Sequence, residues 1–113
     1  MTITAVHTPA PNFSLVGDDT LACKLQDTAA LAGEIHTVLL LQKALNILRH
    51  DPDHVAITGV LDEPTIKAAR AARPLDLLEE FQFWVESYYR DVRRSNPEVT
   101  DAQFELWMAR LRS

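Results

Sequence analysis

The chain has 113 residues, a formal net charge of -5 at pH 7, and a composition that is 47% hydrophobic and 24% charged. These values predict one folded domain and exclude a disordered chain. The acidic balance argues against nucleic-acid binding, which needs cationic side chains, and no apolar run is long enough for membrane insertion. Cys23 is the single cysteine, so no internal disulfide can form, and we expect it to be a small buried apolar group.

Residues 1–22 form the least regular part of the sequence. Residues 2–6 alternate in polarity like a short strand, and Pro9 and Pro11 interrupt any regular element after them. The segment lacks the basic start and the continuous apolar stretch of a secretory signal peptide. We therefore expect the chain to be cytoplasmic as synthesised, so that delivery to the periplasm or the cell wall would require a secretion system or lysis.

The first predicted helix covers residues 20–32. Asp18 and Asp19 offer an N-cap for it, and Gly33 is a typical residue at which such a helix ends. Its expected inner face contains Leu21, Leu25 and Thr28.

The strongest helical pattern covers residues 35–49. Apolar residues recur there at helical spacing, and further apolar residues widen the stripe until little of the helix surface is polar. Such a helix is typical of the centre of a core. We expect the following residues to be buried: Val38, Leu40, Leu41, Ala44, Leu45, Ile47 and Leu48.

A loop and a shorter helix come next. Residues 51–54 predict a turn, and residues 55–60 an extended segment in which Gly59 supplies an unusual backbone angle. Asp62 is the expected N-cap of a helix over 63–72, whose first turn holds Pro64. The carboxylates and the histidine of residues 51–54 fit a solvated turn better than a metal site, so we expect neither a metal nor a cofactor.

Two further helices complete the pattern. The helix over 75–94 carries an apolar stripe of Leu77, Phe81, Trp84, Val85, Tyr88 and Val92. Phe83 falls opposite this stripe and is a candidate partner surface. After a break at Asn96 and Pro97, Thr100 and Gln103 have the spacing of a capping box for a helix over 101–112. The inner face of that helix contains Phe104, Trp107, Met108 and Leu111.

These elements predict an all-α fold, a small bundle of four or five helices over residues 23–113 that follows an irregular segment over 1–22. Residues 24–113 also resemble the C-terminal part of the secretion-activating, lysozyme-like N-acetylmuramidases, which includes their predicted peptidoglycan-binding domain. Six blocks carry the resemblance in the same order and spacing: 24–29 (KLQDTA) with Gly33, 41–46 (LQKALN), 58–61 (TGVL) with 65–66 (TI), 88–90 (YYR), 96–97 (NP), and Trp107 with 110–111 (RL).

The chain also departs from this family. The family's catalytic glutamate lies near its N-terminus in a Glu-Gly-Gly motif, whereas residues 1–23 contain no glutamate. Leu31 stands where the family has an asparagine, and residues 58–63 (TGVLDE) stand where it has Asp-Gly-x-x-Gly-Pro. Asp18 and Asp19 are better explained as a helix cap than as a catalytic pair of carboxylates. The resemblance therefore implies a relative that lacks the catalytic lobe and is not an enzyme.

Two functions are open at this point. The first is a non-catalytic module that binds peptidoglycan or targets the cell wall. Its expected ligand-binding residues are Gly59, Leu61, Asp62, Thr65, Tyr89 and Arg93. Tyr89 lies at the edge of its helical stripe, and the planar guanidinium of Arg93 suits a stem-peptide carboxylate. The second is a protein-interaction adaptor, an inhibitor-like subunit or a structural component of a phage or secretion apparatus. It would use Phe83 to contact a protein partner or a second copy of the chain.

Overall fold

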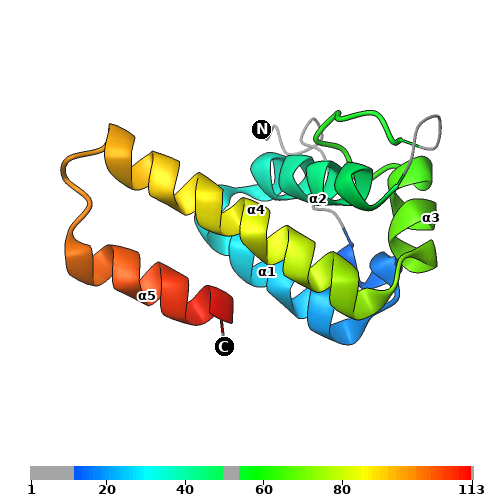
Figure 1. The fold of residues 1–113 in the computed structure, drawn as a ribbon, viewed down its shortest axis with the longest axis horizontal. Coiled ribbons are helices and arrows are strands. Elements are labelled where there is room, and N and C mark those ends of the chain that lie inside the picture. Colours follow the sequence, from blue (N-terminus) through cyan, green and yellow to red (C-terminus); the bar gives the residue numbers. More distant parts are fainter. Residues whose placement is uncertain (1–11, 50–53, 113) are drawn as a thin grey trace, which may run out of the picture.

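The computed structural model describes residues 12–49 and 54–112, and within these ranges it contains helices and no strand (Figure 1). The elements are η2 (Phe13–Val16), α1 (Asp19–Ala32), α2 (Glu34–Leu48), α3 (Glu63–Ala71), α4 (Pro74–Ser95) and α5 (Asp101–Arg112). The predicted all-α fold is therefore confirmed. The strand expected over residues 2–6 and most of the turn expected over 51–54 lie outside the described residues. None of the described helices is long and apolar enough to cross a membrane.

Residues 12–22 belong to the folded unit, although the sequence indicated an irregular segment as far as residue 22. The 3-10 helix η2 packs against α1 and α3 and buries Phe13 and Val16 almost completely. Helix α1 then begins at Asp19, because the Asp18 carboxylate accepts a hydrogen bond from the backbone N–H of Leu21 at 2.9 Å. The two prolines before this segment favoured an irregular structure in the sequence analysis, but the apolar residues of η2 contribute to the core.

The core lies between α2 and α4, which have the most extensive contact of any two elements in the described structure. Figure 1 shows α4 crossing most of the long dimension of the molecule, with α1 and α2 packed beside it. Burial of a large aliphatic or aromatic side chain contributes about 1.5–3 kcal/mol, so this contact is the main source of stability. Its fully buried members are Val38, Leu41, Ala44, Leu45, Leu77, Phe81 and Val85.

Helix α2 is not covered all round, which corrects one expectation. Ile47 is 58% exposed and Leu48 is 38% exposed, whereas both were expected in the core. Both residues belong to the last turn of α2, which ends at Leu48, whereas the apolar residues from Val38 to Leu45 on its covered side are buried. Cys23 was also expected to be buried and is exposed. It lies two residues from both Leu21 and Leu25, and therefore faces away from the buried side of α1.

Helix α4 buries Tyr89 rather than Tyr88. Tyr89 is only 4% exposed, whereas Tyr88 is half-buried. The sequence placed Tyr88 in the apolar stripe and Tyr89 at its edge. The buried row follows a strict i, i+4 ridge instead, from Leu77 through Phe81 and Val85 to Tyr89. Phe83 is 59% exposed, as expected for a residue opposite that ridge.

Helix α5 packs under the C-terminal half of α4 and against α1 (Figure 1). It buries Met108 and Leu111, while the other two expected inner residues are half-buried. Two side chains from other helices satisfy carbonyl groups in its last turn. Lys24 Nζ donates to the Arg110 carbonyl at 3.0 Å, and Gln82 Nε2 donates to the Leu111 carbonyl at 2.9 Å. These bonds bind the end of α5 to α1 and α4, because the last carbonyls of a helix have no partner within it.

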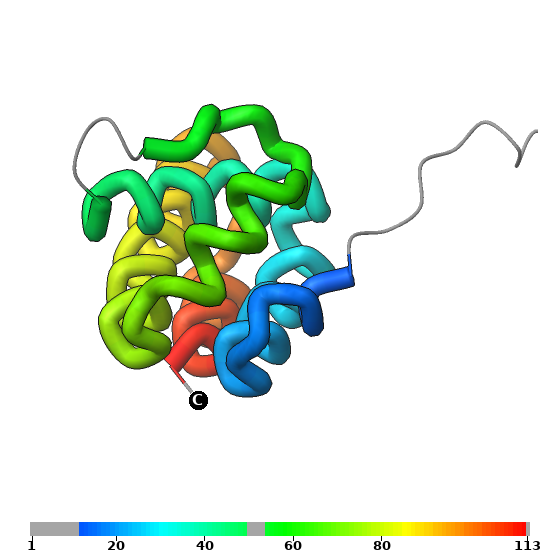
Figure 2. The backbone as a smooth tube through the Cα atoms, turned by 90° about the vertical axis from the view of Figure 1, so that its right-hand side faces the viewer, coloured from blue at the N-terminus to red at the C-terminus, as the bar shows by residue number. Residues whose placement is uncertain are grey.

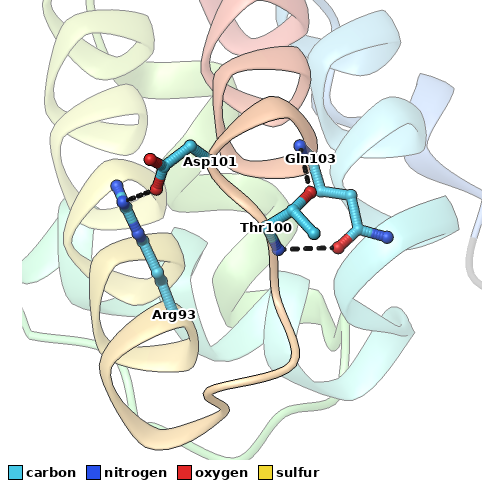
Figure 3. A network of polar contacts seen from close by, with 4 residues as sticks. All are labelled: Arg93, Thr100, Asp101 and Gln103. Atoms are coloured by element: carbon cyan, nitrogen blue, oxygen red, sulfur yellow. Dashed lines mark hydrogen bonds and ion pairs between the residues drawn. The ribbon is translucent and has the colours of Figure 1, made fainter.

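The capping box at the start of α5 is formed as predicted (Figure 3). Gln103 N–H donates to Thr100 Oγ1 at 3.1 Å, and Thr100 N–H donates to Gln103 Oε1 at 3.0 Å. Arg93 of α4 donates to the Asp101 carboxylate in the same turn, which connects the two helices across their loop. The first turn of α5 is thus fixed both by its own cap and by α4.

Removing this cap should destabilise the protein measurably. Thr100→Ala deletes the hydroxyl that accepts the Gln103 N–H, and we expect it to lower the free energy of unfolding by about 1 kcal/mol. Urea denaturation followed by circular dichroism measures the change. Thr100→Ser keeps the hydroxyl and is the matched control, which should stay within about 0.5 kcal/mol of the parent protein. Equal losses in both variants would mean that the cap contributes nothing.

Candidate functional site

Gln42 of α2 is fully buried and organises the loop between α2 and α3. Its Oε1 atom accepts hydrogen bonds from the backbone N–H of Thr58 at 2.9 Å and of Gly59 at 3.0 Å. Its Nε2 atom donates to the Val60 carbonyl at 3.1 Å and to the hydroxyls of Thr58 (3.1 Å) and Thr65 (3.0 Å). One amide side chain therefore holds the residues from 58 to 60 and the first turn of α3 in place.

The same loop has a second anchor one helical turn further along α2. Asn46 Oδ1 accepts the Val55 N–H at 2.8 Å, and Asn46 Nδ2 donates to the Val55 carbonyl at 2.9 Å. Gln42 and Asn46 stand on one face of α2 because they are four residues apart. The backbone of residues 55–60 thus lies along α2. Its N–H and C=O groups form hydrogen bonds with side chains of α2, whereas those of a β-strand would form them with a neighbouring strand.

The network continues into α3. Thr65 Oγ1 accepts from Gln42 and donates to the Asp62 carboxylate, which also accepts the Thr65 N–H at 3.1 Å. Asp62 is the predicted N-cap of α3, and the structure confirms that role. The side chain of Thr65 is fully buried, so its hydroxyl has both a donor and an acceptor partner inside the protein. Asp62 and Thr65 therefore stabilise the start of α3 and its connection to Gln42.

Gly59 lies where a side chain would not fit. Its φ is +79°, and a Cβ atom built there would come 2.9 Å from Ile35 Cγ2 and 3.6 Å from the Ile35 carbonyl. Both the left-handed backbone and the close approach to α2 favour glycine. The loop can pass this near to α2 only because residue 59 has no Cβ.

Gly59→Ala is therefore expected to lower the free energy of unfolding by about 2–3 kcal/mol, through the strained backbone and the contact with Ile35. A double-mutant cycle separates the two causes. Ile35→Ala alone should have little effect because Ile35 is 66% exposed. In that background the cost of Gly59→Ala should fall by about 1 kcal/mol. Denaturation curves of the four proteins give the coupling energy. A coupling energy near zero would show that Ile35 does not restrict residue 59.

The six residues expected to bind ligand do not form one surface. Gly59 and Thr65 are buried, and Leu61 and Asp62 are half-buried around the network of Gln42. Tyr89 and Arg93 instead contact α5, which lies on the opposite side of the bundle from residues 54–62 (Figures 1 and 2). These six residues therefore do not come together as the single ligand-binding site that the sequence predicted.

Tyr89 lies in the interior, between α1, α4 and α5. Its ring centroid is 5.6 Å from that of Trp107, and Thr28 of α1 lines the same small pocket. Burial raises the pKa of this hydroxyl above its ordinary value, against the opposing effects of Thr28 and Arg110. The phenol therefore stays neutral at pH 7. Beside it is a cavity of about 30 Å³, the space of one water molecule.

Arg93 is also engaged within the protein. Besides its ion pair with Asp101, its guanidinium lies 4.7 Å from the centroid of the Phe104 ring. A cation over an aromatic face is stabilised by the ring quadrupole. Arg93 therefore connects α4 and α5, with its guanidinium bonded to Asp101 and placed over the Phe104 ring.

An exposed apolar surface surrounds the loop and was not expected from the sequence. Ile35 at the start of α2 is 66% exposed, and Ile57 and Val60 in the loop are 49% and 61% exposed. A Cβ at Gly59 would meet Ile35, so Ile35 lies beside the loop segment that contains Ile57 and Val60. We call this set the loop surface. Next to it on α2, the ring of His36 lies 5.4 Å from that of Tyr88. In the sequence, the only indication of the loop surface is that Ile35, Ile57 and Val60 belong to no predicted helical stripe.

The described residues include no group of three or more His, Cys, Asp or Glu side chains placed to hold a metal ion. His54 lies in the loop, with its Nε2 atom 2.9 Å from the Arg49 carbonyl. Asp18 is occupied as the cap of α1.

Comparison with known proteins gave no match, whether to a protein-family model, a curated protein or a solved structure.

Proposed function

We propose that this chain is a non-catalytic binding module that recognises peptidoglycan through the loop of residues 54–62. The observation that carries the proposal is the network of Gln42. The leucine–glutamine pair on α2 and the T-G-V-L-D segment with Thr65 are the blocks that resemble the peptidoglycan-binding part of the muramidases, and here they bond to one another. Within this chain, the blocks that carry the resemblance therefore form one connected structural unit.

The recognition residues in this proposal are those that the network presents and does not itself use. They are Ile35, Ile57 and Val60 of the loop surface, together with the aromatic pair of His36 and Tyr88. Exposed apolar and aromatic side chains suit the acetyl methyl groups and ring faces of N-acetylated sugars. Gly59, Asp62 and Thr65 then act by holding the loop, and Tyr89 and Arg93 are not part of the site.

Retention on purified, protein-free peptidoglycan sacculi tests this proposal, with lysozyme-digested sacculi as the control for an intact polymer. Val60→Asp should abolish retention because it places a charge in the centre of the loop surface. Leu106→Asp is the matched control, since Leu106 on α5 is 64% exposed and Val60 is 61% exposed. Retention of Val60→Asp equal to that of the parent protein, or no retention of the parent protein, would reject the proposal.

The apolar character of the loop surface also supports a second function, that of a protein-interaction adaptor or structural subunit. Exposed apolar side chains are common at protein interfaces, and those of Ile35, Ile57 and Val60 are all at least 49% exposed. This function predicts one stoichiometric protein partner that co-purifies with the parent protein. The same partner should co-purify with the Leu106→Asp variant but not with the Val60→Asp variant. A partner that both variants retain would contradict it.

A further inference from the structure

The side of α4 that faces away from the core has an ordered distribution of charge around one aromatic residue. Phe83 is at its centre and is 59% exposed. Residues four, seven and eleven positions away from Phe83 share its face on an α-helix. By this spacing the outer face of α4 contains the following residues: Asp76, Glu79, Phe83, Ser87, Arg90 and Arg94.

Along the row of residues through Phe83 the charge changes sign, and Glu86 and Asp91 flank the row beside the two arginines. Asp76 and Glu79 precede Phe83, and Arg90 and Arg94 follow it. Beside Phe83 is an open hollow of about 500 Å³, and its lining is mainly acidic. The hollow is lined by Leu48, Asp76, Glu79, Glu80 and Phe83.

Contacts within the chain leave these charges available. Arg90 pairs with Glu86 at 2.7 Å, and Arg94 pairs with Asp91 at 2.9 Å. The two guanidinium side chains remain 54% and 75% exposed. Asp76 lies 3.6 Å from Arg73 and is 48% exposed. Exposed pairs of neighbouring residues on one helix are weak, so they can exchange partners when a second charged surface approaches.

We propose that the outer face of α4 pairs two copies of this chain in an antiparallel, two-fold symmetric arrangement. Glu79 and Arg90 lie about 8 Å on either side of the midpoint between Trp84 and Val85, because each helical residue rises 1.5 Å. An antiparallel partner centred on this midpoint places the partner's Arg90 beside Glu79, and the partner's Glu79 beside Arg90. A parallel partner would place like charges together.

The same register brings the two apolar centres into contact. Phe83 and the partner's Phe83 are offset by about 4.5 Å along the helices, and packed helices lie 8–10 Å apart. Both rings can therefore meet at the two-fold axis, while the partner's Arg94 reaches the acidic hollow near Asp76. An interface that uses the same patch on both subunits closes after two copies, so the product is a dimer and not a fibre.

Sedimentation equilibrium at low ionic strength tests the pairing over a range of protein concentrations. The chain is expected to show a reversible monomer–dimer equilibrium that weakens as salt is added, since the pairs are exposed. Glu79→Arg and Arg90→Glu are each expected to weaken association at least tenfold, because each places like charges opposite one another twice. Phe83→Ala should weaken it as well. Glu105→Arg, the same change of charge at an exposed site on α5, is the control.

Mixing the two reversed proteins gives the decisive result. In an equimolar mixture of Glu79→Arg and Arg90→Glu, every arginine faces a glutamate of the other chain, so association should return as a heterodimer. The double variant should also associate with itself. Circular dichroism checks that each variant is folded. The proposal is overturned if the parent protein stays monomeric at every concentration, if the single reversals associate normally, or if the mixture fails to associate.

Discussion

Phe81→Ala is expected to lower the free energy of unfolding by about 3–5 kcal/mol, the largest effect of any single substitution that we predict here. Phe81 is the largest fully buried side chain in the core, with 0% exposure, and it lies on the α4 ridge that packs against α2. Alanine would leave a cavity that close-packed neighbours fill only partly. Chemical denaturation followed by circular dichroism at 222 nm measures the loss.

Phe83→Ala is the matched control for this experiment. The two phenylalanines are on the same helix, two residues apart, and differ in exposure from 0% to 59%. Phe83→Ala is expected to change the stability of the monomer by no more than about 0.5 kcal/mol, partly because alanine is the better helix former. The comparison must be made at concentrations where the chain is monomeric, since dimerisation adds apparent stability. Similar losses in both variants would contradict the placement of the core.

Gln42→Met is expected to lower the free energy of unfolding by about 2–4 kcal/mol. Methionine has nearly the same shape but removes all five hydrogen bonds to Thr58, Gly59, Val60 and Thr65. The Gly59 N–H would then be buried without a partner, and leaving such groups unpaired costs about 1–3 kcal/mol each. The loss is limited where water reaches the released groups of the exposed loop residues.

Hydrogen exchange gives this prediction a second, local measurement. The amides of Thr58 and Gly59 should exchange much faster in Gln42→Met than in the parent protein, while those in the middle of α4 change only with global stability. Gln26→Met is the control, because Gln26 is exposed on α1 and the substitution is chemically the same. If both glutamine variants were equally stable, the loop would be held by other contacts.

The helices and their ends could be predicted from the sequence because their signals are local. Asp62 and Thr100 each cap a helix within three residues of the group they bond to, so the pattern is visible in a short window. Tyr88 and Tyr89 could not be distinguished in this way. Both fit a broad apolar stripe, and the choice between them depends on the direction from which α1 and α5 pack against α4.

The candidate site was much harder to predict than the fold. A glutamine in an apolar helix indicates a buried polar contact, but the partners of Gln42 are 16 to 23 residues away in sequence. Periodicity carries no information about such distant bonds. Four of the six residues expected to bind ligand belong to blocks that resemble a family, and several of those blocks hold the loop in place. The exposure of Ile57 and Val60 depends on how the loop packs against α2, which the local sequence does not determine.

The bonds from Gln42 and Asn46 also determine how the loop would behave when a ligand arrives. Its backbone is fixed at residues 55, 58, 59 and 60 before any ligand is present. Binding would then require little loss of conformational entropy from the protein, and the free and bound loops should have nearly the same shape. If the loop binds a ligand as proposed, it would do so as a preorganised surface, and the ligand would adapt to the protein.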